Sequence, residues 1–162
     1  MTEKNLNDLF FAQLKDIYFA EKQIYKALPK MAKATKEPQL KDAFLAHREQ
    51  TQGHIERLEG VFEMIGKRPQ TKPCEAIKGI ITEGEETIED FGASEAIDTG
   101  LVAAGQAVEH YEIARYGSLI AWARTLNMPK VAALLNETLQ EEIKTDQLLS
   151  SIGASKVDRK AA

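Results

Sequence analysis

Apolar residues recur every three or four positions along most of the chain, in five separate stretches. In the first stretch Phe10, Leu14 and Ile17 follow this spacing, which is that of one face of an α-helix. The pattern predicts helices over residues 3–35, 38–65, 74–91, 95–126 and 129–152. Because Pro29 lies inside the first of them, we expect a kink or an early end of that helix there.

The connections between these helices predict how they pack. Short connections at residues 36–37 and 127–128 place the flanking long helices side by side and antiparallel. The longer segment 66–94 contains the shorter helix and has room to cross the whole bundle. No stretch shows the alternation typical of a strand. We therefore predict an all-α domain over residues 1–152, with two antiparallel helix pairs and a fifth short helix in the crossover. The tail 153–162 is expected to fray.

The composition excludes several kinds of partner. Among 162 residues, 21 are Lys or Arg and 25 are Asp or Glu, a net charge of −4. Without a basic excess we expect no nucleic-acid binding. No apolar run approaches the roughly 20 residues of a membrane span, and the first residues lack the pattern of a signal peptide. Cys74, the one cysteine, cannot form an internal disulfide, so we expect a cytoplasmic protein without a membrane partner.

Three glutamates lie where apolar residues are expected. At about 100° per residue, Glu21 falls within about 20° of Leu14 and Leu28, in the middle of the apolar stripe of its helix. Glu112 and Glu142 occupy the same position in the stripes of their own helices. The pattern therefore predicts three carboxylates that point into the core of the bundle.

Spacing relates these positions to one another. Residue 112 follows residue 21 by 91 positions, and residue 142 follows residue 51 by 91 (112 − 21 = 142 − 51), which indicates a weak internal repeat of helix pairs. The fourth position is occupied by Thr51 rather than by a glutamate, but His47 and His54 on the same helix also face inward. Glu109 precedes Glu112 by three residues, about 60° away on the helix.

Burying several carboxylates without partners would cost many kcal/mol or force their protonation. Metal ions would compensate for this cost, and oxygen and imidazole donors suit iron, manganese or zinc. The candidate metal ligands are Glu21, His54, Glu109, Glu112 and Glu142. A metal-free network of hydrogen bonds between these groups and nearby tyrosines is the alternative. We expect His47 to be a core-edge histidine bonded to a carboxylate, and Glu49 and His110 to face solvent.

Four segments carry a resemblance to a known family: 16–23 (DIYFAEKQ), 47–51 (HREQT), 108–114 (VEHYEIA) and 139–146 (LQEEIKTD). With them the chain resembles, over about residues 7–149, the YciE/YciF-type bacterial stress proteins of the ferritin-like superfamily. The resemblance implies a ferritin-like four-helix bundle, a homodimer, a di-iron centre and a role in stress responses. Against the related rubrerythrin-type pattern, Thr51-x-x-His54 replaces a Glu-x-x-His motif, and Glu142-x-x-Thr145 lacks the second histidine.

Two main hypotheses of function follow, besides a ferritin-style storage cage, which would require a large spherical oligomer. The first is a ferritin-like stress-response protein that binds one or two iron or manganese ions in the bundle core, with redox activity towards peroxide or Fe(II). The second is a non-enzymatic helical dimer that acts through partner contacts and keeps its core carboxylates as a relic network. Removing Glu112 separates them, because a metal protein should then lose its metal, whereas a relic network should keep its assembly.

Overall fold

The computed structural model describes residues 3–162. Five long helices follow one another: α1 (Leu6–Ala34), α2 (Pro38–Met64), α3 (Glu75–Phe91), α4 (Ile97–Thr125) and α5 (Pro129–Ile152). A short π-helical turn, η1 (Gly153–Val157), and α6 (Asp158–Ala161) end the chain. The described part of the chain contains no strand, so the all-α prediction is confirmed.

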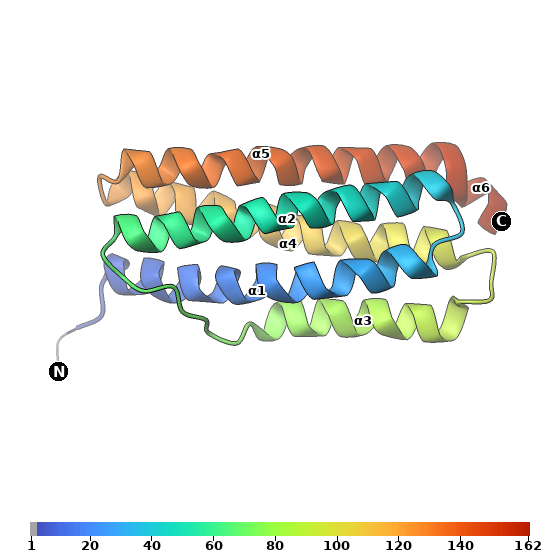
Figure 1. Ribbon diagram of the computed structural model, residues 1–162, viewed down its shortest axis with the longest axis horizontal. Helices are drawn as coiled ribbons and strands as arrows, with labels where there is room; N and C mark the ends of the chain where they lie inside the picture. Colours follow the sequence, from blue (N-terminus) through green and yellow to red (C-terminus); the bar gives the residue numbers. More distant parts are fainter. Residues whose placement is uncertain (1–2) are drawn as a thin grey trace.

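The helices form a four-membered bundle with one helix outside it. The bundle consists of the antiparallel hairpins α1–α2 and α4–α5, and α2 also packs on α5 and α1 on α4. Helix α3 packs on α1 and α4 and lies along the outside of the bundle (Figure 1). It therefore covers the face between these two helices and belongs to the crossover, as the length of the connection predicts.

Local sequence explains where the helices begin and end. The side chain of Asn5 accepts hydrogen bonds from the backbone N–H groups of Asn7 and Asp8, and Asp8 accepts one from the backbone of Asn5, so α1 begins with a capping box. Proline occupies the first position of α2 and of α5, where its missing N–H costs nothing. By contrast, α1 continues through Pro29 to Ala34 and does not end early.

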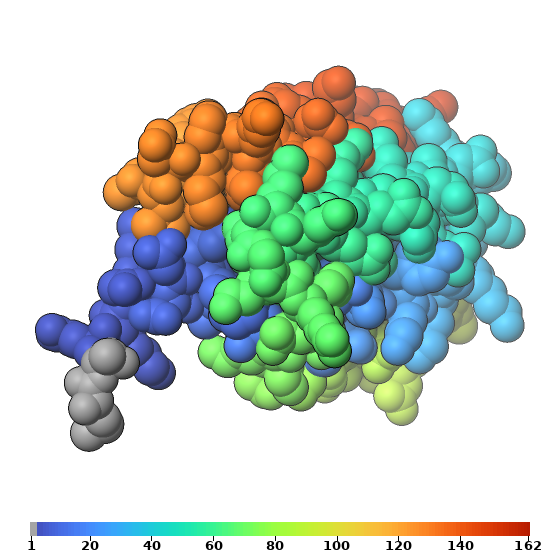
Figure 2. Space-filling view, turned by 60° about the vertical axis from the view of Figure 1, so that its left-hand side comes forward, coloured from blue at the N-terminus to red at the C-terminus, as the bar shows by residue number. Residues whose placement is uncertain are grey.

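The connection after α2 crosses the bundle on its surface. Gly66 has a φ of 70°, the left-handed conformation in which glycine commonly ends a helix. The segment that follows runs across α1 (Figure 2), and the backbone N–H of Lys72 donates to the carbonyl of Lys15 at 3.2 Å. The side chain of Cys74 then caps α3 by accepting from the N–H of Ile77. The connection thus delivers the chain to the outer face of α1 before α3 starts.

The expected fraying of residues 153–162 is not what the structure shows. The tail is helical from Gly153 to Ala161, and Val157 is buried at 2% exposure. The hydroxyl of Thr99 donates to the carboxylate of Asp158 at 3.2 Å, and the ammonium of Lys160 lies 3.4 Å from the carboxylate of Glu37. The tail is therefore held against the bundle by these polar contacts and by the burial of Val157, which removes apolar surface from water.

The core of the bundle is apolar at both ends and ionisable in the middle. Phe10, Phe44 and Phe62 are among the largest fully buried side chains, whereas Glu21 and Glu112 are buried to the same degree. No helix within residues 3–162 is long and apolar enough to cross a membrane. The fold therefore places charged groups in the part of the molecule where burial is most costly.

Candidate metal centre

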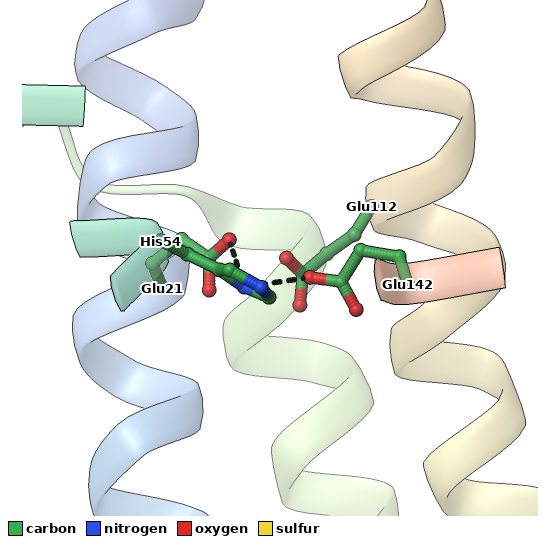
Figure 3. Close-up of side chains that lie close together, drawn as sticks. All are labelled: Glu21, His54, Glu112 and Glu142. Carbon is green, nitrogen blue, oxygen red and sulfur yellow. Dashed lines mark ion pairs between the residues drawn. The ribbon is translucent and has the colours of Figure 1, made fainter. Parts of the chain in front are cut away.

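Four ionisable side chains from four different helices meet inside the bundle. They are Glu21 of α1, His54 of α2, Glu112 of α4 and Glu142 of α5, and each is 0% exposed (Figure 3). One potential ligand atom from each lies within 4.8 Å of one from every other member. We call these four residues the first group. Three carboxylates and one imidazole at this spacing can hold a divalent cation.

A second group shares one member with the first. It consists of His47, Glu109 and Glu142, whose potential ligand atoms also lie within 4.8 Å of one another. His47 is 3% exposed and Glu109 is 1% exposed. Because a carboxylate has two oxygens, Glu142 can serve both groups at once. The arrangement is that of two neighbouring sites with a common ligand.

The imidazole of His54 is oriented by residues outside the first group. Its Nε2 lies 2.9 Å from Oε2 of Glu141, and the other oxygen of Glu141 accepts a hydrogen bond from the guanidinium of Arg57 at 2.6 Å. The carboxylate favours the tautomer in which Nε2 carries the proton. Nδ1 of His54 is then free to face Glu21 at 3.3 Å and Glu142 at 3.0 Å, as metal-ligating histidines do.

Hydrogen bonds also support the other ligands, but unequally. The hydroxyl of Tyr116, itself fully buried, donates to Oε1 of Glu21 at 2.7 Å. In the second group, Nδ1 of His47 lies 3.4 Å from Oε1 of Gln50 and 3.5 Å from the hydroxyl of Thr145. These longer, neutral contacts leave Nε2 of His47 facing Glu109 at 2.8 Å. The first group is therefore held by charged and short contacts, and the second by weaker ones.

Many buried polar atoms of the two groups lack a hydrogen-bond partner within residues 3–162. They are Oε2 of Glu21, Nε2 of His47, Nδ1 of His54, Oε2 of Glu109, and both carboxylate oxygens of Glu112 and of Glu142. Two pairs of these atoms lie close together without the alignment of a hydrogen bond: Nδ1 of His54 is 3.0 Å from Oε1 of Glu142, and Nε2 of His47 is 3.7 Å from Oε2 of Glu142. Buried polar groups are rarely left unpaired. Oxygen and nitrogen atoms that are close together but not hydrogen-bonded to one another are what is expected of ligands that surround a common cation.

The protonation of the first group shows the cost of burying its charges. Burial, together with the nearby charges of Glu142 and Glu21, raises the pKa of Glu112 well above its usual range. For Glu21 burial acts in the same direction, but the charge of His54 and hydrogen bonds outweigh it and lower the pKa. Burial lowers the pKa of His54, yet Glu21 and Glu142 overcome it and raise that pKa to about 11. The protein alone thus stabilises the ion pair of His54 with Glu21 and favours the protonated form of Glu112.

The second group shows the same effect in its carboxylates. Burial raises the pKa of Glu109 to about 7. Burial and the neighbouring Glu109 raise the pKa of Glu142 to about 8. A cation between these oxygens would reverse both shifts, because it favours the ionised form. A metal ion that binds here would therefore displace protons from these buried carboxylates.

The chain matches the family described as a domain of unknown function, DUF892, over residues 5–162. It belongs to this family. Protein YciF of Escherichia coli strain K12 is 44% identical over 162 residues, with 99% of this chain and 98% of that protein covered. The predicted relationship to the YciF-type proteins is thereby confirmed.

Solved structures with similar folds agree with this result. The crystal structure of the E. coli stress protein YciF matches with a TM-score of 0.92 and 43% identity, covering 97% of this chain and 99% of that one. YcfI of Rhodopseudomonas palustris, provisionally described as a structural protein, matches with a TM-score of 0.89 and 42% identity over 91% and 94% of the two chains. A protein of Xanthomonas campestris, at 23% identity, 96% and 94% coverage and a TM-score of 0.75, shares the fold.

Within this DUF892 chain, all five residues predicted as ligands come together. Glu21, His54, Glu112 and Glu142 lie in the first group, and Glu109 lies in the second. Glu49 and His110 are exposed, with 79% and 68% of their side chains accessible, as expected.

Two further residues contribute to the site. His47 was expected to bond a carboxylate at the edge of the core; its Nε2 does lie 2.8 Å from Glu109, and its ring also completes the second group. Glu141 was not singled out, although it contacts His54. Its signal in the sequence is weak, because a glutamate next to an inward-facing glutamate is expected to point to solvent.

Two threonines occupy positions where the ferritin-like pattern has metal ligands, and other residues supply the missing donor atoms. Thr51 is buried and donates its hydroxyl hydrogen to the carbonyl of His47 at 2.8 Å, so it adds no ligand. Thr145 lies next to His47, which brings an imidazole to the place where the pattern has a histidine. The two groups together offer four carboxylates and two imidazoles. Ferritin-like two-metal centres have the same donor count, so the residues present fit a pair of metal ions.

Proposed function

We propose that this chain is a stress-response protein that binds two divalent transition-metal ions, iron foremost, side by side in its bundle. Glu21, His54, Glu112 and Glu142 would hold one ion, and His47, Glu109 and Glu142 the other. The observation that carries the proposal is the shared carboxylate of Glu142 between two groups of buried, unpartnered donor atoms. The mixture of oxygen and imidazole donors favours iron, manganese or zinc over soft, thiolate-seeking metals.

A pair of iron ions held in these groups would supply two-electron redox chemistry, one electron from each ion, which is what the reduction of peroxide to water requires, with Fe(II) from solution as the source of electrons. The chain would supply the rest. Tyr116 fixes Glu21 through its hydroxyl, and Glu141 fixes the ring of His54. The raised pKa values of Glu109 and Glu142 imply that these carboxylates release protons when they become ligands. The apolar core around them keeps bulk water away from the site.

The biological setting in this proposal follows the relatives. YciF of E. coli is described as a stress protein, and 44% identity over the whole chain supports a similar role here. We include a cytoplasmic homodimer in the proposal. Light scattering of the purified protein measures the number of chains, and a monomer at all concentrations would contradict the dimer.

Elemental analysis of protein purified without chelator tests the metal proposal. We expect close to two ions per chain for the wild type after anaerobic Fe(II) loading, and a large loss in Glu112→Ala. Glu49→Ala is the matched control, because Glu49 is a glutamate whose side chain is 79% exposed. It should keep the wild-type metal content. A wild-type chain that binds no iron, manganese or zinc would overturn the proposal.

The alternative is a structural protein without metal, which the description of YcfI favours. In this case Glu112→Ala would leave the assembly intact and could raise the stability of the fold, since replacing buried polar groups by apolar ones often does so. The same variant therefore distinguishes the two functions. Metal loss supports the first, whereas a more stable and equally metal-free variant supports the second.

A further inference from the structure

A small apolar cavity adjoins the second group. It has a volume of about 20 Å³, which is room for about one water-sized molecule. His47, Glu109 and Thr145 are the only polar residues in its wall; the other nine lining residues, which include Ile24, Phe44 and Leu149, are apolar or glycine. None of Glu21, His54, Glu112 and Glu142 lines this cavity or the second cavity described below, so the free space adjoins only the second half of the centre.

Glycine keeps this cavity open on one side. A Cβ atom at Gly105 would lie 3.0 Å from Cδ1 of Leu149 and 3.2 Å from Cε1 of Phe44. Both distances are tighter than ordinary van der Waals contact, so a side chain at 105 would press into the wall of the cavity. The free space next to Glu109 therefore depends on the absence of a side chain at this position of α4.

A second cavity lies next to the first, beneath α3, and reaches towards the surface. It also has a volume of about 20 Å³, and it shares Ala27, Met31, Ile81 and Val108 with the first cavity. Its outer wall includes Lys30 and Glu85, whose charged groups pair at 3.1 Å with 69% and 51% of their side chains exposed. Exposed pairs of this kind contribute little stability, so the outer end can open at small cost.

The chemistry of the walls selects what could pass. A hydrated cation or an anion would lose its water shell without compensation between apolar walls. Hydrogen peroxide would lose hydrogen bonds for the same reason, because most of the wall offers it no partner. A small apolar molecule loses nothing, and apolar cavities of proteins take up such molecules readily.

We propose that the two cavities form an access passage for a small apolar molecule of the dioxygen class, which ends at His47 and Glu109. The proposal rests on the proposed metal function, and it selects dioxygen over peroxide and Fe(II) as the molecule that reaches the second group by this route. Metal ions then enter the bundle elsewhere. Helix α3 forms the outer wall of the passage. The crossover helix would thus control how dioxygen reaches the second group.

Dioxygen itself is the probe, used on the metal-free protein. Under dioxygen pressure, the methyl groups of Ile24 and Leu149 should show a larger paramagnetic relaxation enhancement in NMR spectra than those of Leu14 and Leu119, which are buried but line neither cavity. Equal enhancement at both pairs would overturn the proposal. This measurement requires no metal, so it is independent of the proposed function.

Ala27→Leu tests the passage where the two cavities meet. Ala27 is partly exposed, so a leucine can be accommodated there, and it should abolish the extra enhancement at Ile24 and Leu149. Ala12→Leu is the control, because Ala12 is also a partly exposed alanine of α1 and lines neither cavity. It should behave as the wild type. Gly105→Ala narrows the same cavity from α4 and serves if Ala27→Leu does not fold.

Metal loading separates failure of the passage from failure of the proposed function. We expect wild type, Ala27→Leu and Ala12→Leu to bind the same amount of Fe(II), and only Ala27→Leu to consume dioxygen several-fold more slowly. Normal metal content without dioxygen uptake in the cavity would overturn the passage alone. Dioxygen uptake in a chain that binds no metal would overturn the proposed function, and with it the role of the passage.

Discussion

The two groups of the candidate centre share Glu142 but differ in their surroundings. In the first group, a charged pair of residues outside the site, Glu141 and Arg57, orients His54, and Tyr116 fixes Glu21. In the second group, the ring of His47 has only Gln50 and Thr145 next to its Nδ1, at 3.4 and 3.5 Å, and an apolar cavity adjoins it.

This difference indicates that the two groups would hold their metal ions in different ways. Four donors with firm support favour a tightly held ion. Three donors next to free space favour an ion with open coordination positions, which is the arrangement that catalytic metal sites use. The predictions below test whether the two groups bind with different strength and whether their surroundings are the cause.

The largest effect is expected for Glu142→Ala, because it removes the ligand that both groups share. We expect the loss of both ions, measured as metal per chain after Fe(II) loading and desalting. Glu137→Ala on the same helix is the control, since the side chain of Glu137 is 61% exposed. A Glu142→Ala protein that keeps one ion would show that the two groups do not depend on a common carboxylate.

The next effect in size is expected for His47→Ala, which removes a ligand of the second group alone. We expect half of the wild-type metal content, with the tighter binding phase of an anaerobic Fe(II) titration unchanged. His54→Ala should instead remove the tighter phase. If both variants lost the tighter phase, the two groups would bind metal as one unit. The two groups would then not differ in their affinity for Fe(II).

Stability of the metal-free protein should fall as the pH rises from 5 to 8. The folded-state pKa values of Glu109 and Glu142, about 7 and 8 because of burial, lie above the usual 4.5. The folded chain therefore holds protons that the unfolded chain has released, and the free energy of unfolding decreases with pH by an amount on the order of a few kcal/mol.

Urea unfolding at several pH values, with chelator present, measures this dependence. In Glu109→Gln the slope should be smaller, because one of the buried carboxylates with a raised pKa is gone. A metal-free wild type that becomes more stable between pH 5 and pH 8 would contradict the raised pKa values.

Most of the fold could be predicted from the sequence, because the patterns that define helices are local. The apolar period of 3.6 and the prolines at 38 and 129 predicted the boundaries of the long helices to within three residues. The fraying expected of the tail is not what the structure shows, since Val157 is buried and Asp158 and Lys160 contact Thr99 and Glu37. A single apolar position in a charged segment has no period to reveal it.

Only those site residues could be predicted whose direction follows from their position around a helix. The phase of Glu21, Glu112 and Glu142 on their apolar stripes was sufficient to bring them together, because helix geometry fixes the direction of each side chain. The role of His47 depends on which ring nitrogen faces Glu109, and that of Glu141 on the packing of α5 against α2. Both are tertiary features, which one helix considered alone does not contain.

The smallest effects are expected for the residues that orient the two histidines. Glu141→Ala should weaken the tighter site by about 10- to 100-fold, the usual cost of losing a partner of a ligating histidine. Glu137→Ala is the control, because Glu137 also lies near Arg57, at 3.3 Å, and Glu141 alone of the two contacts His54. Gln50→Ala should weaken the other site much less, because its neutral contact with His47 is long at 3.4 Å. If both variants lost the same affinity, the support around the histidines would not explain the difference between the groups, and the number of donors would have to account for it.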